Sequence, residues 1–168
     1  MPFKKLSHNL FANHRYTFDT CSFNAVLQPL RAYSRDRFQS LWREIEKAIV
    51  YGVIVSHVEV YKEILQAKEF KDELAWVRKN KGIFADYDLA REPGIISDLG
   101  SLFPTFIHQY KKQARNADPW LVAQAKANKL TIVTEETGKD TQIPVVCSKI
   151  GVACVNIRQV IEREKWVI

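Results

Sequence analysis

The stretch "DPWLVAQAKANKLTIVTEE", residues 118–136, joins a helix start to a buried strand, and this succession decides the fold class. Asp118 favours the N-cap of the helix, and Pro119 favours its first position. "LTIVT", residues 130–134, is a largely β-branched run of strand length. A helix that leads directly into a buried strand is the building unit of a parallel sheet.

The same alternation continues on both sides of this stretch. We expect strands at "YTF" (16–18), "VIVS" (53–56) and "VACVN" (152–156), and apolar residues at helical spacing follow each of them. Strands and helices that alternate in this way favour an α/β fold whose central sheet is mainly parallel.

Capping-box spacing predicts where two of the helices begin. Asp36 and Gln39 have this spacing at the head of an amphipathic segment that ends near Gly52. Ser56 and Glu59 repeat it directly after the second expected strand. We therefore predict that Asp36 and Ser56 cap these two helices.

Composition narrows the class of protein. The chain has 168 residues, which suits one domain, and its 46% hydrophobic content argues against disorder. A formal net charge of +6 favours an anionic partner, with nucleic acid as the first candidate. Three cysteines without a CxxC pair favour a reducing compartment.

The N-terminal residues do not have the pattern of a targeting segment. Residues 1–14 are a basic lead-in without the apolar centre of a signal peptide, and no apolar run in the chain reaches membrane-spanning length. We expect a cytoplasmic protein without membrane contact, whose single domain spans residues 15–168.

Acidic side chains follow the expected strands or open the expected helices. Because the carboxyl ends of parallel strands meet at one edge of a sheet, acids from separate elements are expected to converge there. Two of them lie four residues apart, on one face of a helix. The residues concerned are Asp19, Glu59, Glu63, Asp118, Glu135 and Glu136.

Each acid also has a structural explanation, as an N-cap, a capping-box residue or a solvated charge. As a set, however, they would repel one another unless cations lay between them. Oxygen ligands suit Mg²⁺ or Mn²⁺, and two such ions can hold an attacking water and a leaving oxygen in phosphodiester cleavage. An acidic site in a basic protein is typical of a nuclease.

Three segments resemble the ordered motifs of PIN-domain nucleases: "YTFDTCSF" (16–23), "IVSHVEVYKEIL" (54–65) and "ADPWLVAQAKANKLTIVTEE" (117–136). The "LW" pair of residues 41–42, "DPWL", "VTEE" and "IPVVCSKIGVACVN" (143–156) are similar to a PIN-like branch related to VapC toxins. The resemblance covers about residues 15–168. It implies a three-layer α/β/α fold with an acidic pocket at the carboxyl edge of the sheet.

The resemblance also implies which acids bind metal. Asp19 and Asp118 match the first and third acids of the family's pattern, and Glu63 matches the second better than Glu59 does. Glu136 lies at the usual distance for the fourth acid, and the adjacent Glu135 is the alternative.

The match departs from the family's pattern at two positions. The usual fourth acid is Asp rather than Glu, and Cys21 stands where many PIN domains have Asn or Ser. We expect four residues to support the metal-binding carboxylates through hydrogen bonds: Thr20, Ser22, Glu59 and Thr134.

The leading hypothesis is an Mg²⁺- or Mn²⁺-dependent endoribonuclease, the toxin of a toxin–antitoxin pair, which hydrolyses RNA with a metal-activated water. Its expected partners are RNA, a cognate antitoxin protein and, as is common in the resembled family, a second copy of the chain. Alternatives are a catalytically silent module that binds nucleic acid or protein, and a DNA-directed nuclease. The basic residues expected to contact RNA phosphates are Arg78, Lys79, Lys81, Lys111, Lys112 and Arg115.

Overall fold

The computed structural model describes residues 15–67, 71–108, 116–138 and 142–168. Its central sheet has five strands in the order β3-β2-β1-β4-β5, and every neighbouring pair is parallel. The predicted α/β class with a parallel sheet is therefore confirmed. The strands are β1 (Tyr16–Phe18), β2 (Ile54–His57), β3 (Phe84–Ala85), β4 (Thr131–Val133) and β5 (Cys154–Val155).

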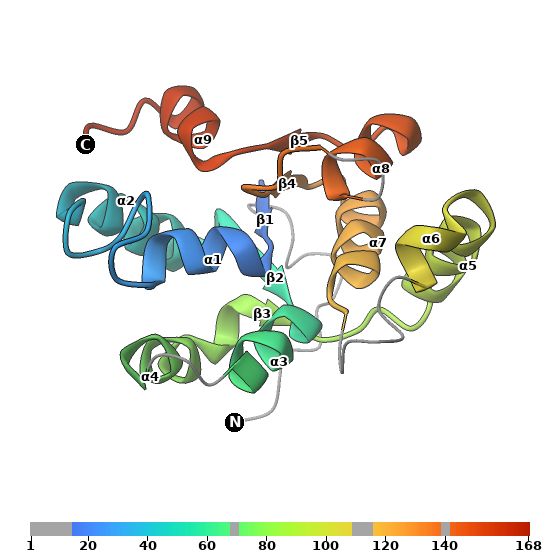
Figure 1. The fold of residues 1–168 in the computed structure, drawn as a ribbon, viewed down its shortest axis with the longest axis horizontal. Coiled ribbons are helices and arrows are strands. Elements are labelled where there is room, and N and C mark those ends of the chain that lie inside the picture. Colours follow the sequence, from blue (N-terminus) through green and yellow to red (C-terminus); the bar gives the residue numbers. More distant parts are fainter. Residues whose placement is uncertain (1–14, 68–70, 109–115, 139–141) are drawn as a thin grey trace.

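Helices cover both faces of the sheet, which gives the three-layer α/β/α arrangement that was expected. In Figure 1, α1, α2, α4 and α9 lie on one side of the strands, and α5 to α8 lie on the other. Helix α3 contacts both α1 and α7. The helices are α1 (Thr20–Leu27), α2 (Gln39–Val50), α3 (Val58–Ala67), α4 (Lys71–Lys79), α5 (Glu92–Leu102), α6 (Pro104–His108), α7 (Asp118–Asn128), α8 (Ile143–Ile150) and α9 (Ile157–Glu164).

An aromatic cluster fills the layer between the sheet and α1, α2 and α4. The Phe23 ring of α1 lies 5.6 Å from that of Phe18 and 5.5 Å from that of Phe84, measured between ring centroids. The Trp76 ring of α4 packs edge-on against Trp42 of α2 at 5.3 Å. Aromatic pairs of this kind each add about 0.5–1.5 kcal/mol beyond the area they bury.

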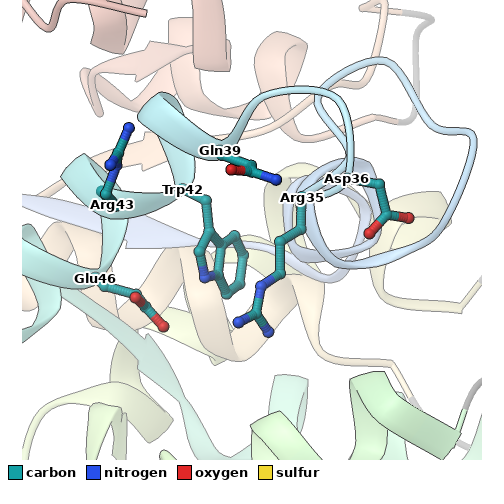
Figure 2. A pocket seen from close by; sticks show the side chains of 6 residues that line it. All are labelled: Arg35, Asp36, Gln39, Trp42, Arg43 and Glu46. Atoms are coloured by element: carbon teal, nitrogen blue, oxygen red, sulfur yellow. The ribbon is translucent and has the colours of Figure 1, made fainter.

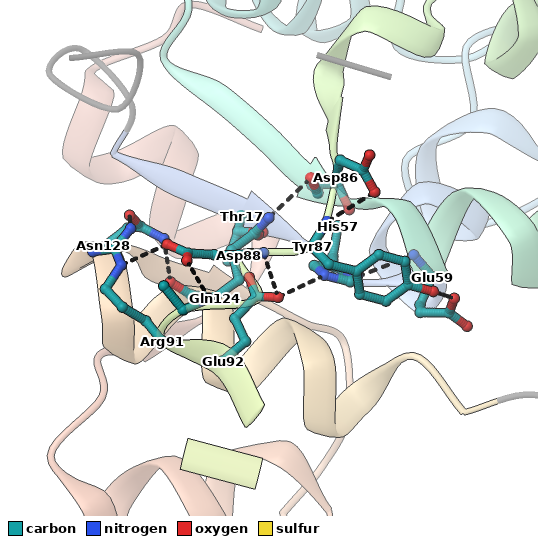
Figure 3. A network of polar contacts seen from close by, with 12 residues as sticks. Thr17, His57, Glu59, Asp86, Tyr87, Asp88, Arg91, Glu92, Gln124 and Asn128 are labelled. Carbon is teal, nitrogen blue, oxygen red and sulfur yellow. Dashed lines mark hydrogen bonds and ion pairs between the residues drawn. The ribbon is translucent and has the colours of Figure 1, made fainter. Parts of the chain in front are cut away.

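The opposite face of the sheet is fastened to α7 by polar contacts. The Thr17 hydroxyl of β1 donates to Gln124 Oε1 at 2.8 Å, and Gln124 Nε2 donates to the Ser56 carbonyl of β2 at 3.2 Å. All three residues are fully buried. Because buried polar groups are costly when they lack partners, this network fixes where α7, and hence Asp118 at its start, lies against the sheet (Figure 3).

The two predicted capping boxes are wrong. Helix α2 begins at Gln39 after Phe38, without a side-chain cap, because the preceding turn is held by backbone bonds from Arg37 and Phe38 to the Ser34 carbonyl. Ser56 belongs to β2, where its hydroxyl donates to the Phe18 carbonyl at 2.6 Å.

The residues that cap α3 and α7 also differ from those predicted. At the start of α3, His57 takes the role predicted for Ser56, because its Nδ1 accepts the Glu59 N–H at 3.0 Å. The predicted N-cap at Asp118 is wrong by one residue. Ala117 occupies the cap position of α7, and Asp118 is the first residue inside the helix.

The strand order creates a crevice at one place on the carboxyl edge. From β1 the chain proceeds to β2 and β3 on one side, and it later returns to β4 and β5 on the other. The crevice between β1 and β4 is thus the topological switch point, where open parallel sheets bind their ligands. Asp19 directly follows β1, and Thr134 directly follows β4.

Candidate active site at the switch point

Asp19 is buried at the end of β1 and caps α1, as the structural explanation of this residue predicted. Its Oδ1 accepts the Ser22 N–H at 2.7 Å, its Oδ2 accepts the Cys21 thiol at 2.9 Å, and it is only 3% exposed. Burial raises the pKa of the Asp19 carboxyl, and hydrogen bonds from Cys21, Thr134 and Ser22 oppose that increase.

Cys21 joins Asp19 to the far side of the crevice. Its Sγ lies 3.3 Å from Thr134 Oγ1 and accepts the Glu135 N–H at 3.2 Å. Burial and the charge of Asp19 raise the pKa of the thiol, which therefore stays protonated and donates to the carboxylate. In the sequence, Cys21 was noted only because it departs from the family's pattern. Its position two residues after an aspartate that caps a helix could have indicated a contact with that carboxylate.

Two of the four residues expected to support the carboxylates, Ser22 and Thr134, contact Asp19, whereas Glu59 bonds Lys62 and Tyr87 instead. The Ser22 backbone N–H binds Asp19, while the Ser22 hydroxyl donates to the Val133 carbonyl at 2.9 Å. Thr134 helps to hold the pKa of Asp19 down and also accepts the Glu136 N–H at 3.1 Å. Thr20 instead lies near Glu63 and lowers the pKa of that carboxyl. The buried Thr20 Oγ1 has no well-formed hydrogen bond to another described residue.

Glu63 brings α3 to the start of α7. Its Oε2 accepts the Ala117 N–H at 3.2 Å, beside Asp118. Burial, then the charge of Asp118 and then that of Asp19 raise the pKa of Glu63 to about 7. Two other acids therefore lie close enough to Glu63 to disfavour its ionised form.

The structure separates Glu136 from Glu135. Glu136 Oε2 accepts the Ile143 N–H of α8 at 2.8 Å, and its pKa is raised to about 7 by burial, Asp118 and Asp19, in that order. Glu135 Oε1 accepts the Ile157 N–H of α9 at 2.8 Å, and its pKa is raised by burial and by Asp19. Glu136 thus shares its surroundings with Glu63, whereas Glu135 lies toward α9.

Four of these carboxylates are held by the same kind of hydrogen bond. Asp19, Glu63, Glu136 and Glu135 each accept a backbone N–H at or beside the start of a helix, namely α1, α7, α8 and α9. The partial positive charge of a helix N-terminus favours a carboxylate there. The helices therefore fix the direction of the acids without removing their mutual repulsion.

The acids have oxygen donors suited to a hard divalent cation. No Lys or Arg in the described part of the chain forms an ion pair with Asp19, Glu63 or Glu136. The same segments contain no group of three or more His, Cys, Asp or Glu side chains arranged to hold a metal ion. The oxygen donors of these carboxylates are of the kind that Mg²⁺ and Mn²⁺ prefer, so the residue types fit such a cation although their present arrangement is not a ready-made site.

Glu59 belongs to a different network from Glu63. Its Oε1 accepts from Lys62 Nζ at 2.6 Å and from the Tyr87 hydroxyl (Figure 3). Beside it, the rings of His57 and Trp120 stack at 5.7 Å, and Tyr87 packs edge-on against Trp120 at 4.8 Å. Glu63 is therefore the member of this helical pair that lies with Asp19 and Asp118.

The basic residues expected to contact RNA are only partly described. Arg78 and Lys79 end α4, and Lys81 follows just before β3. Because all strands are parallel, the start of β3 lies at the edge opposite to the acids. Their contact with RNA stays a prediction. Lys111, Lys112 and Arg115 lie outside the described residues.

A surface pocket of about 290 Å³ is formed by residues in α2 and in the loop before it (Figure 2). The Arg35 guanidinium lies 5.2 Å from the centroid of the Trp42 ring within it. The pocket is lined by Arg35, Asp36, Gln39, Trp42, Arg43 and Glu46. None of these is a predicted site residue.

A family model described as a domain of unknown function, DUF4411, matches residues 16–168. The chain belongs to the DUF4411 family. No curated protein matches this DUF4411 chain. Among its described helices, none has both the length and the apolar character required to cross a bilayer. Because the family description names no activity, the chemistry of the site has to carry any proposal of function.

Proposed function

We propose that this DUF4411 chain is an endoribonuclease that depends on a divalent cation. One observation carries the proposal. Acids from four separate elements meet at the switch point of the sheet, where burial and mutual charge raise the pKa of Glu63 and Glu136 to about 7. A cation bound there would relieve this repulsion, and the net charge of +6 favours a polyanionic substrate.

In this proposal Asp19, Glu63 and Asp118 hold the cation, and Glu136 completes the site. Bound Mg²⁺ or Mn²⁺ would supply charge neutralisation at the phosphate and acidify a water molecule. The chain's own residues prepare the site, since Cys21 and Thr134 orient Asp19 and the helix N-termini orient the glutamates. Since Glu63 and Glu136 titrate near neutral pH, cation binding is expected to release protons.

The biological setting is the finer part of the proposal. The resemblance of the motifs at 16–23, 117–136 and 143–156 to VapC-related proteins supports a cytoplasmic toxin that a cognate antitoxin restrains. The same resemblance supports a homodimer. Copurification of a neighbouring gene product that inhibits cleavage would test this setting.

A second function is favoured by a specific observation. Four of the acids already accept backbone N–H groups, and the described residues contain no ready-made metal-holding group. A catalytically silent module, which binds nucleic acid or a partner protein, would need no more than this. If the protein is such a module, the acids serve to stabilise the starts of the helices, and replacing them with neutral residues should leave nucleic-acid binding intact.

The decisive experiment compares cleavage of structured RNA and of DNA by purified protein with Mn²⁺, with Mg²⁺ and with EDTA. Copurified protein is first removed by unfolding and refolding on a column. Cleavage of RNA that needs a metal supports the proposal, and cleavage of DNA alone would redirect it to a DNA nuclease. An absence of cleavage with every metal would contradict it and favour the silent module.

Asp19→Asn links the activity to the site. Asparagine keeps the N-cap of α1, so the variant should fold and retain RNA while cleavage falls by at least about a hundredfold. Asp36→Asn removes an exposed acid from the loop before α2 and serves as the matched control. Normal cleavage by Asp19→Asn would show that the active site lies elsewhere.

A further inference from the structure

A second pocket of about 310 Å³ adjoins the acids beside α1. It borders the candidate active site through Cys21, whose thiol donates to Asp19, and through Glu135, whose N–H donates to that thiol. Pockets for small organic groups begin at about 300 Å³, so this one has room for a single nucleoside. Its lining residues are Cys21, Asn24, Ala25, Arg31, Ala32 and Glu135.

Arg31 is held in place by the loop that carries it. Its Nε donates to Oε1 of Gln28 at 3.0 Å, and Gln28 is only 3% exposed. Just before it, Leu30 has a φ of 64°, a left-handed conformation that is costly for a leucine. The turn is fastened to α1 by the bond from the Tyr33 N–H to the Ala25 carbonyl. The turn that contains Leu30 therefore has a defined backbone path, and Arg31, its next residue, lines the pocket.

Across the pocket, Glu135 supplies a carboxylate whose position is also fixed. One of its oxygens accepts the Ile157 N–H. Burial raises the pKa of the neighbouring Tyr33 phenol, and the charge of Glu135 raises it further. Ala25 and Ala32 leave the space between these groups open. The Asn24 side-chain amide makes no hydrogen bond to other described residues, so it can serve as a further donor or acceptor.

We propose that this pocket binds the guanine base of the nucleotide next to the phosphate at the acidic site. Guanine presents the O6 and N7 acceptors that suit an arginine fork, and its N1–H and N2–H₂ donors suit a carboxylate. Arg31 and Glu135 line the same pocket and supply these two complementary groups. The inference rests on the proposed function for the neighbouring phosphate, and it adds the base that the chain selects.

Binding, which needs no catalysis, is the first test. Fluorescein-labelled hexaribonucleotides that differ only in one central base are titrated into Asp19→Asn protein, with anisotropy as the readout. We expect the guanine oligonucleotide to bind about tenfold more tightly than its adenine, uracil or cytosine counterparts. Equal affinity for all four would overturn the inference.

Variants of Arg31 show whether the pocket makes this choice. Arg31→Lys keeps the positive charge but loses the planar fork, so general RNA affinity should persist while the guanine preference disappears. Arg163→Lys, the same exchange at an exposed position of α9, is the matched control and should keep the preference. Thermal unfolding confirms that each variant is folded. A guanine preference that survives in Arg31→Lys would overturn the assignment.

A cleavage map separates this inference from the proposed function. If the wild type cleaves RNA next to guanine and Arg31→Lys cleaves without base preference, both stand. Cleavage without base preference in the wild type would retain the nuclease and overturn the pocket. Guanine-selective binding without cleavage under any metal would retain the pocket as a base-binding site and overturn the nuclease.

Discussion

The thiol of Cys21, in the first turn of α1, donates at 2.9 Å to Oδ2 of Asp19, the carboxylate that directly follows β1. The same sulfur contacts Thr134 and the Glu135 N–H after β4. Cys21 therefore links the segments that follow β1 and β4, the two neighbouring strands between which the strand order reverses. A thiol is a weak donor, and burial compensates by keeping it protonated.

Cys21→Ala should weaken cation binding at Asp19. Without the thiol, the carboxylate loses a hydrogen bond that opposes its raised pKa, and it is free to turn toward Thr134. Loss of such an orienting contact typically costs 10- to 100-fold in metal affinity, and we expect about tenfold for a weak donor. Isothermal titration with Mn²⁺ at pH 7 measures the change.

Cys21→Ser is the matched control, because its hydroxyl can still donate to Asp19. It should retain most of the Mn²⁺ affinity. If the serine variant is as weak as the alanine variant, the sulfur acts by filling space and not by donating a proton.

Much of the fold could be predicted because its signals are local. A short apolar run between helical segments is sufficient to mark a buried parallel strand, and β1, β2, β4 and β5 lie within one or two residues of their expected positions. Asp19 could be recognised as a cap for the same reason. Its partner Ser22 is three residues away.

The predictions that did not hold depend on distant partners. Ser56 has the spacing of a capping box, but its hydroxyl bonds the carbonyl of Phe18 in the neighbouring strand. The separation of Glu136 from Glu135 depends on the starts of α8 and α9, which no local pattern around "VTEE" reveals. Likewise, Glu59 and Glu63 share a helix face in sequence, and only the tertiary contacts of Tyr87 and Ala117 distinguish them.

Without divalent cations, the protein should lose stability as the pH rises from about 5 to 8. Glu63 and Glu136 have pKa values of about 7 in the folded state against an ordinary 4.5, so between these values the folded state holds more protons than the unfolded state. This contribution is present at low pH and is lost as both groups ionise. After allowance for partial exposure we expect a loss of roughly 2 kcal/mol, or about 4–8 °C in Tm.

Thermal unfolding at several pH values in EDTA measures this effect. Glu63→Gln should reduce the pH dependence, because it removes one of the two carboxyls whose pKa is raised to about 7. Added Mn²⁺ should raise Tm more at pH 8 than at pH 5, since protons compete with the cation for the carboxylates. A Tm in EDTA that is constant or rises between pH 5 and 8 would contradict the raised pKa values.

His57 should matter for stability through two separate contacts. Its Nδ1 accepts the Glu59 N–H at the start of α3, so Nε2 carries the proton toward Glu92, 3.3 Å away. Both His57 and Glu92 are essentially inaccessible to solvent. His57→Asn can keep the cap but removes the donor to Glu92, which then keeps only the Asp88 N–H among the described residues, and this should cost about 2–3 kcal/mol. His57→Gln can keep the contact with Glu92 but loses the cap, which should cost only about 1 kcal/mol.

Urea unfolding of the two variants decides between these contacts. A double variant, His57→Asn with Glu92→Gln, should recover part of the loss because the carboxyl that lost its donor is gone. If His57→Gln is the less stable of the two single variants, the helix cap is the more important contact.

Trp42→Phe should leave stability nearly unchanged, within about 1 kcal/mol. Trp42 is 4% exposed, and its Nε1 is buried without a hydrogen-bond partner among the described residues, which is a cost that phenylalanine removes. The smaller ring gives up some contact with Trp76 and with the Arg35 guanidinium, and this loss opposes the gain. Trp42→Ala keeps neither ring nor contact and should cost about 3–5 kcal/mol. Urea unfolding of both variants tests the comparison, and a phenylalanine variant as unstable as the alanine one would mean that the indole N–H has a partner in solution.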